Sequence, residues 1–289
     1  EPTAEWVGTP SPISEEDLAA LAPEELLRTL QAWEAPANPS FGEAGSEGLG
    51  RAAAAVMLGR LPDYAPLAGD AGRLPPALVS QIVSTLDRAV REGHLGDRDA
   101  GTSFMLGLAG VFVVRPETGM WAREARRSIA SFLSHAASQG VLSEDDGKRT
   151  LAVFRVLLED VDPTPESEEQ DLANGYDAGT LALNSVRGEA TTGTIELLLE
   201  ARRLDWALVH EEASDLLRNV ARTDPALSVK AAMGLRLPWL LARDSAHQEE
   251  WLTLLFGDLV TDSARKATWE AYLLYSRFFQ RAMRDEGLM

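Results

Sequence analysis

The sequence predicts an all-α protein built as a stack of helical hairpins. Strand signals are scarce, and the one short β-branched run, residues 111–114, follows an apolar stretch that a buried helix explains equally well. Proline, glycine and acidic residues interrupt the apolar segments at short intervals, as turns between stacked helices require. A Val-Arg or Val-Lys pair also recurs 43 residues apart. The competing prediction is an irregular helical bundle.

Local start signals place the helices of the N-terminal half. Ser14 stands before three carboxylates, which is the pattern of an N-cap followed by an acidic first turn. Pro23 suits the first position of the next helix, and the prolines and glycines of residues 35–48 predict a loop. Further helices are expected at residues 49–60, 63–69, 75–92, 102–114, 119–139 and 146–160.

The segment VDPTPESEEQ, residues 161–170, predicts a boundary. It combines two prolines with four acidic residues, so we expect an exposed linker or long loop over 161–177 with solvated carboxylates. This linker would separate an N-terminal helical subdomain, 1–160, from a C-terminal repeat-like subdomain, 178–289. In the second subdomain helices are expected at 178–203, with a break near Asn184, and at 206–222, 226–242, 246–259 and 263–286.

The recurring pair consists of Val186-Arg187 and Val229-Lys230. Helical repeats of the HEAT and armadillo kind recur at about 40–47 residues. The spacing therefore predicts a HEAT- or armadillo-like α-solenoid over residues 178–286, whereas the N-terminal half shows no clear echo. In such repeats the valine packs inward and the basic residue reaches a preceding acidic turn.

These roles predict specific partners. Lys230 should reach Asp224, and Arg187 has only the distant Asp177 as an acidic residue in the turn before it. Asn184 or Ser185 should cap the helix that carries Val186 and Arg187. A glycine inside a helix costs about 1 kcal/mol relative to alanine. We therefore expect Gly193 to lie where a neighbouring helix crosses closely.

Composition excludes several classes of function. The chain has 45 acidic and 27 basic residues, a formal net charge of −18, which repels nucleic acid and anionic lipid. It has no cysteine, so disulfides and thiolate metal sites are excluded, and a reducing cytoplasm is the expected location. No apolar run reaches the roughly eighteen residues of a membrane span. We expect no nucleic-acid partner and no membrane partner.

No catalytic motif stands out. No two of the four histidines lie within four residues of each other, and neither a phosphate-binding glycine loop nor a nucleophile elbow occurs. The run Glu144, Asp145 and Asp146 follows Ser143, which favours a capped helix start. We expect neither a cofactor nor enzymatic activity. The alternative is a helical enzyme that holds a divalent metal on those three carboxylates.

Tryptophan offers the best candidates for an interaction surface. The chain has seven, and tryptophan is enriched in the residues that dominate binding energy at interfaces. Trp206, Trp251 and Trp269 are the tentative interaction residues. Packing between stacked helices is the favoured explanation for these tryptophans, as it is for Trp239, which lies in an apolar run after Pro238.

Three segments together resemble a known class of protein. They are residues 14–36, SEEDLAALAPEELLRTLQAWEAP; the DPTP segment with its acidic tail; and residues 179–190, GTLALNSVRGEA. They are similar to the helical C-terminal regions of large bacterial multidomain proteins, including STAND-type NTPases of antiphage defence. The resemblance departs at residues 191–194, TTGT, where bulkier helix formers are usual.

This resemblance implies a sensor or scaffold role. In such proteins the nucleotide-binding and effector modules lie upstream, and the helical region binds other domains or a protein ligand. The chain begins with Glu1 rather than methionine, so we expect a fragment of a longer bacterial protein. The sequence predicts a non-catalytic, protein-binding domain and leaves its oligomeric state open.

Overall fold

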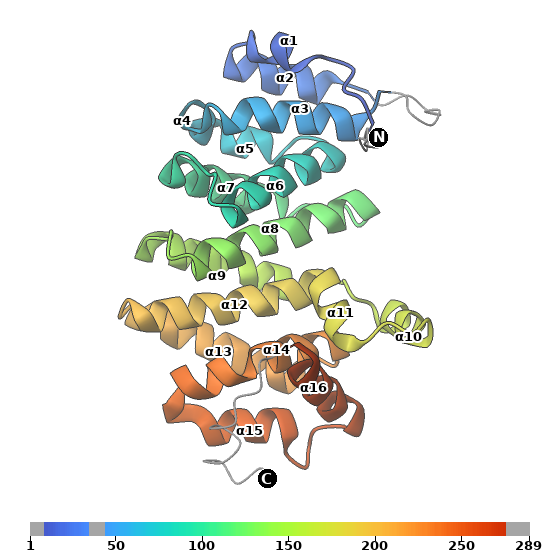
Figure 1. Ribbon diagram of the computed structural model, residues 1–289, viewed down its shortest axis with the longest axis vertical. Coiled ribbons are helices and arrows are strands. Elements are labelled where there is room, and N and C mark those ends of the chain that lie inside the picture. Colours follow the sequence, from blue (N-terminus) through green and yellow to red (C-terminus); the bar gives the residue numbers. More distant parts are fainter. Residues whose placement is uncertain (1–8, 35–43, 276–289) are drawn as a thin grey trace, which may run out of the picture. The chain divides into compact units, whose positions relative to one another are not determined.

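The computed structural model describes residues 9–34 and 44–275. Within these residues every regular element is a helix and no strand occurs, which confirms the all-α helical stack (Figure 1). The segment 111–114, for which a strand was one option, contributes the end of a helix instead. The chain divides into two compact units, Glu1–Ala136 and Ala137–Met289. None of the described helices is both long enough and apolar enough to cross a membrane.

The first unit begins with two short helices and continues with longer ones. Its elements are α1 (Glu15–Ala19), α2 (Pro23–Ala32), α3 (Ser46–Leu58), α4 (Leu61–Tyr64), the 3-10 turn η1 (Ala65–Leu67), α5 (Ala68–Ala71), α6 (Pro76–Arg91) and α7 (Arg98–Phe112). Helix α8 (Met120–Ser138) runs across the division between the units. Helix α1 packs on α3, α3 packs on α6, and α7 packs on α4, η1 and α5.

The second unit contains the predicted repeat region. Its elements are α9 (Glu144–Leu158), α10 (Pro165–Ala173), α11 (Ala178–Asn184), α12 (Val186–Arg203), α13 (Ala207–Thr223), α14 (Leu227–Arg243), η2 (Ser245–His247), α15 (Gln248–Phe256) and α16 (Asp262–Tyr275). The predicted helix 263–286 is present as far as residue 275, and its remainder lies outside the described residues.

Residues 161–177 differ from the predicted linker. They lie inside the second unit, and residues 165–173 form helix α10. The reason is local, because the Thr164 side chain accepts a hydrogen bond from the Ser167 amide, and Pro165 occupies the first helical position. The prolines and carboxylates that suggested a solvated loop therefore begin a helix.

Long helices of the second unit pack in a regular succession. Helix α9 packs on α12, α12 on α14, and α14 on α16. Helix α13 packs against α9 and α12, and α15 packs against α13 and α14, so these two helices lie beside the succession rather than in it. The predicted repeat residues lie at the starts of α12 and α14 and in the turn before α14.

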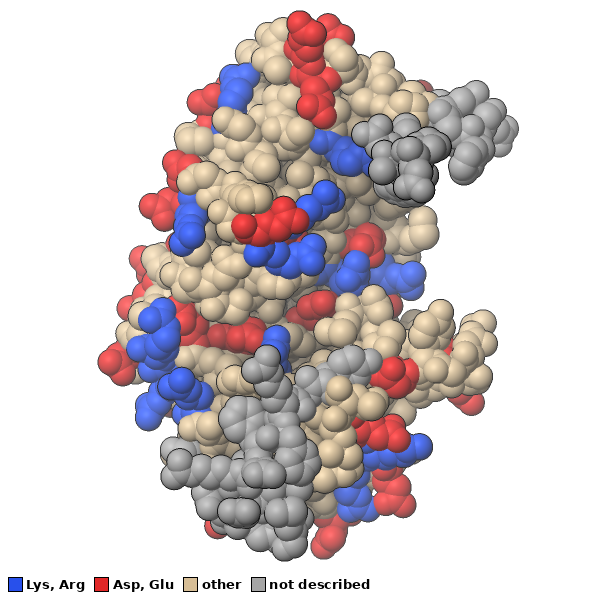
Figure 2. Space-filling view, viewed as in Figure 1, with Lys and Arg blue, Asp and Glu red and all other residues tan. Residues whose placement is uncertain are grey.

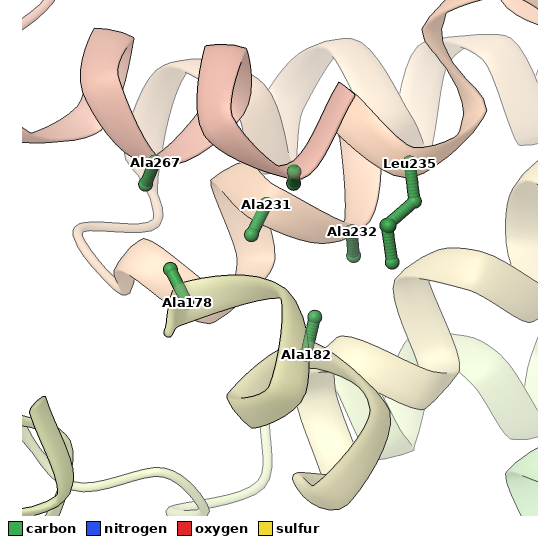
Figure 3. Close-up of a cluster of buried hydrophobic side chains, with 7 residues drawn as sticks. Ala178, Ala182, Ala231, Ala232, Leu235 and Ala267 are labelled. Carbon is green, nitrogen blue, oxygen red and sulfur yellow. The ribbon is translucent and has the colours of Figure 1, made fainter. Parts of the chain in front are cut away.

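The α11, α14 and α16 helices meet through small side chains. Figure 3 shows alanines of the three helices pointing toward one another, together with Leu235. The cluster consists of Ala178, Ala182, Ala231, Ala232, Leu235, Ala267 and Ala271. Because alanine adds so little volume, the helix backbones approach closely. A Cβ atom added to Gly234 of α14 would lie 2.1 Å from the carbonyl oxygen of Thr268 in α16.

The prediction for Gly193 agrees with the structure. A Cβ atom built on this residue of α12 would lie 2.4 Å from Cζ of Phe154, a buried residue of α9. The glycine therefore makes room for a phenylalanine ring at the crossing of two helices. The TTGT segment, which seemed too small for a helix in this class, is buried here against the neighbouring helices.

Candidate functional site

A buried polar network joins the starts of two helices in the second unit. Arg187, the second residue of α12, donates through Nη1 to both carboxylate oxygens of Asp224 at 3.0 and 2.9 Å. Its Nη2 donates to the carbonyl oxygen of Pro163 at 2.6 Å. The side chains of Arg187 and Asp224 are 15% and 7% exposed. The pair thus links the α12 start to the turn before α14 in a largely dry setting.

The predicted partners of this network need correction. Asp224 pairs with Arg187 of α12 rather than with Lys230. Asp177 does not serve Arg187; its side chain caps α11 by accepting from the Thr180 amide at 2.9 Å. A basic residue at a helix start can reach forward to the next acidic turn as well as backward, and sequence spacing does not distinguish the two.

The start of α12 is capped from two directions. Ser185 is the N-cap and accepts from the Gly188 amide at 3.2 Å. Asn184 is the last residue of α11, and its amide nitrogen donates to the Thr180 carbonyl at 2.8 Å. Of the two predicted caps, Ser185 is therefore the one present. The carboxylate of Asp162 accepts from the Val186 amide at 2.7 Å, although it lies 24 residues earlier.

Glu168 performs a similar task for α14. Its two carboxylate oxygens accept from the backbone amides of Leu227 and Ser228 at 2.8 and 2.7 Å. These amides belong to the first turn of α14, where helix N–H groups have no partner within the helix. Glu168 is buried, contrary to the solvated role expected for residues 166–169. Helix α10 is thus fastened to the start of α14 by a carboxylate placed at the positive end of a helix dipole.

Replacing Glu168 with alanine is expected to lower the free energy of unfolding by about 2–3 kcal/mol, because it leaves two amides at a buried helix start without an acceptor. Urea denaturation followed by circular dichroism measures this change. Glu169 is exposed and provides the matched control, and its replacement with alanine should change stability by less than about 0.5 kcal/mol. Equal effects of the two replacements would contradict the capping role.

Val186 and Val229 both pack inward, as predicted. Each is fully buried. Val186 is the first residue of α12, whereas Val229 is the third residue of α14, so the two are not at identical positions in their helices. Lys230 is also buried, at 6% exposure, and its ammonium donates to the carbonyl oxygen of Ala221 at the end of α13. Burial lowers the pKa of this ammonium, and the attraction of Asp224 offsets part of that effect.

A groove lies where Lys230 and Asp224 face the ends of α13, α15 and α16. It has a volume of about 930 Å³ and lies entirely within the second unit. Its lining includes Asp224, Lys230, Glu250, Leu254, Leu259 and Val260. We call this feature the α13–α16 groove. Its size falls in the range of about 300–1,000 Å³ that ligand pockets occupy.

Charges in the α13–α16 groove are partly neutralised by neighbours. Glu250 accepts from Arg222 at 2.7 Å and from Arg218 at 3.4 Å. Glu249 and Asp258 form no ion pair within the described residues. Leu259 is fully exposed, so the groove edge presents an apolar side chain to solvent. On the molecular face drawn in Figure 2, acidic and basic side chains are interspersed.

The three candidate tryptophans lie in different environments. Trp251 is fully buried, and its Nε1 donates to Asp244 at 2.8 Å, so it is a core residue rather than an interaction residue. Trp206 is half-buried, with its ring against Gly147 of α9. Trp269 is half-buried between Phe256 and Tyr272, with ring centroids 5.9 and 5.3 Å away. All three pack against neighbouring helices.

The acidic run at residues 144–146 is the start of α9. Ser143 and Asp146 form a capping box, in which the Ser143 hydroxyl accepts from the Asp146 amide at 3.2 Å. Lys148 lies 3.1 Å from Asp145 and 3.5 Å from Glu144. Across the described part of the chain, no group of three or more histidine and carboxylate side chains is arranged to hold a metal ion.

Two histidines lie against buried aspartates. In the first unit, Nδ1 of His135 is 2.8 Å from Asp87, and the Ser131 hydroxyl donates to that same aspartate at 3.2 Å. Ser131 thus lies on the Asp87 side of the ring, whereas a catalytic serine faces the opposite nitrogen. In the second unit, Nδ1 of His247 lies 2.8 Å from Asp244.

His210 of α13 is half-buried. Burial lowers its pKa, although the carboxylate of Asp244 acts in the opposite direction. Burial alone would raise the pKa of Asp244, but the hydrogen bonds from His247 and Trp251, together with the charges of His247 and His210, lower it. These residues form a second polar cluster around the α14–α15 connection.

Sequence reasoning identified Arg187 and Asp224 but missed Asp162 and Glu168. The dipeptides Asp162-Pro163 and Asp224-Pro225 are alike, and this likeness was a usable signal for Asp162. Glu168 had no comparable signal, because the helix start that it caps lies 59 residues further along the chain. The α13–α16 groove also combines residues from four helices and their connections, so no local sequence pattern predicts it.

Comparison with known proteins identifies no relative of this chain. Neither the protein-family models, nor the curated proteins, nor the solved structures include a significant match to the chain. The candidate site is accordingly defined by the geometry of the second unit.

Proposed function

We propose that the chain is a non-catalytic helical scaffold that binds a segment of a protein partner in the α13–α16 groove. The observation that carries the proposal is the groove itself, a 930 Å³ hollow with apolar and charged lining at the ends of packed helices. A site on rigid helices holds its contact residues in fixed positions before binding, which lowers the entropic cost of association. Leu259 at its edge supplies exposed apolar surface of the kind that partners cover.

An α-solenoid of the HEAT or armadillo kind is the architecture we propose for the second unit. The succession α9, α12, α14 and α16, with α13 and α15 packed beside it, supports this proposal. So does the ion pair between Arg187 and Asp224, which couples the start of one long helix to the turn before the next. Solenoids present such repeated turns as extended binding surfaces.

The wider role that we propose is that of a sensor or scaffold region in a larger bacterial protein. Support comes from the resemblance of residues 14–36, the DPTP segment and residues 179–190 to helical regions of STAND-type NTPases, including those of antiphage defence. The absence of cysteine agrees with a reducing compartment, so the cytoplasm is the proposed location.

Selection of random peptides displayed on phage against the immobilised chain tests groove binding. We expect enriched peptides whose affinity falls at least about tenfold when Leu259 is replaced with aspartate, because this introduces a charge into the apolar edge. Leu208 is also an exposed leucine, at 62%, but it does not line the groove. Its replacement with aspartate is the matched control and should leave affinity unchanged.

Two outcomes would overturn the proposal. One is that no enriched peptide depends on Leu259. The other is that the Leu208 and Leu259 replacements weaken binding equally, since the peptides would then recognise general surface properties rather than the groove.

A further inference from the structure

Lys230 is a buried cation that lines the α13–α16 groove. Only 6% of the residue is exposed. Its position in the first turns of α14 directs the ammonium toward the end of α13, where it donates to the Ala221 carbonyl oxygen. A charged side chain buried to this extent is usually paired with an opposite charge. Hydrophobic packing alone does not explain why the charged side chain of Lys230 is buried.

The donors of Lys230 are only partly used. An ammonium has three N–H donors, and Ala221 accepts from one of them. Asp224 is the nearby acid, but its carboxylate already accepts from Nη1 of Arg187 through both oxygens and from the Ala226 amide. Asp224 attracts the ammonium without forming a hydrogen bond to it among the described contacts. Two donors of this ammonium therefore have no acceptor among the described contacts, and the residue lines a large groove.

We propose that Lys230 binds a carboxylate of the partner segment. The segment would place this carboxylate on the unused donors and an aliphatic side chain on Leu254 and Val260, which line the same groove. The carboxylate is either an aspartate or glutamate side chain or the C-terminus of the partner chain. This inference rests on the proposed binding of a protein segment in the α13–α16 groove.

The carboxylates in the groove lining oppose a ligand with two negative charges more strongly than one with a single charge. Glu249 and Asp258 line the groove without ion-pair partners in the described residues, and Arg222 is engaged by Glu250. A phosphate group, with a charge near −2 at neutral pH, would be repelled by these carboxylates more strongly than a monoanion. A single carboxylate matches the single charge of Lys230, and the hydrogen bonds between two charged groups are about twice as strong as neutral ones.

Peptides selected on the groove provide the first experiment. Replacing Lys230 with methionine should weaken their binding about ten- to hundredfold, the range expected for a lost hydrogen bond to a charged group. Amidating the peptide C-terminus tests the terminal carboxylate, and changing each aspartate or glutamate to its amide tests the side chains. We expect one of these changes to weaken binding to the wild-type chain and to have no effect on the Lys230→Met variant. The control is Lys148→Met, which removes an exposed lysine outside the groove.

A measurement on the wild-type chain avoids any dependence on how Lys230→Met folds. The sequence has three lysines, and Lys148 and Lys266 are exposed, with side chains at 49% and 72%. Titration of the ¹⁵N-lysine-labelled chain with 4-methylpentanoate, an aliphatic monocarboxylate, should shift the Nζ signal of Lys230 and raise its pKa. The signals of Lys148 and Lys266 should stay in place.

The outcomes separate this inference from the proposed function. Peptides that depend on Leu259 but tolerate Lys230→Met and loss of every carboxylate would overturn the role of Lys230 and leave groove binding intact. Failure to obtain Leu259-dependent peptides would overturn both. A 4-methylpentanoate titration that leaves Lys230 unshifted, or shifts all three lysines alike, also counts against a carboxylate site.

Discussion

Replacing Asp224 with alanine is expected to lower the free energy of unfolding by about 3–5 kcal/mol. The replacement leaves the guanidinium of Arg187, which is 15% exposed, without its carboxylate. It also removes the acceptor of the Ala226 amide. The guanidinium then keeps only its hydrogen bond to the Pro163 carbonyl oxygen, which does not replace the lost solvation by water, so this is among the costliest single changes in the chain. Urea denaturation followed by tryptophan fluorescence measures the change.

The exposed pair formed by Arg155 and Glu212 is the matched control for this prediction. Its atoms are 2.8 Å apart, but the side chains are 51% and 58% exposed, so replacing Glu212 with alanine should cost less than about 1 kcal/mol. Combining Asp224→Leu with Arg187→Met should recover part of the lost stability, because the guanidinium is then no longer buried without its carboxylate. Equal costs for the buried and exposed pairs would show that burial of the Arg187–Asp224 pair contributes little.

The helices of this chain could be placed from sequence because their signals are local. Ser14, Pro23 and Ser143 act within one turn of themselves, and each begins a helix where the sequence predicts one. The break near Asn184 was also predicted, because the expected helix 178–203 was unusually long, and the structure confirms it. Such signals depend on three or four consecutive residues and not on the tertiary fold.

The linker prediction was wrong because composition does not report burial. The composition of residues 161–170 predicted solvated side chains. In the structure Glu168 is buried, and the Asp162 carboxylate accepts a hydrogen bond at the start of α12. Both carboxylates act on helix starts that lie 24 to 60 residues away along the chain. Whether an acidic residue is solvated or caps a distant helix is decided by tertiary packing, which a single sequence does not specify.

The candidate site was predictable to the same extent. The sequence predicted that Arg187 and Asp224 would each pair with a charged residue near a helix start. In the structure Asp224 pairs with Arg187, 37 residues away, instead of with Lys230 as expected. Because Asp224 is bound to Arg187, Lys230 keeps unused hydrogen-bond donors beside the α13–α16 groove. The unused donors of Lys230 therefore follow from the pairing of Asp224 with Arg187, which the sequence did not predict.

Replacing Gly234 with alanine is expected to destabilise the chain by about 3 kcal/mol, at the upper end for an overpacked site. The added Cβ atom would lie 2.1 Å from the carbonyl oxygen of Thr268 and 2.9 Å from its carbonyl carbon. These are backbone atoms of α16 and cannot rotate away, so α14 and α16 must separate and loosen the alanine cluster between them. At Gly193 the corresponding clash is with the ring of Phe154, which can tilt, and alanine there should cost less.

Gly110 provides the control, because it is also a helical glycine but is exposed and has no atom within 4 Å of an added Cβ. Alanine at this position should stabilise the chain by about 0.5–1 kcal/mol through its higher helix propensity. Urea denaturation of the three variants tests the order Gly110, Gly193, Gly234 from most to least stable. The same propensity gain applies at Gly234, so a loss of stability there measures the steric cost of separating α14 from α16. A neutral or stabilising Gly234→Ala would mean that α14 and α16 are not held at this close distance.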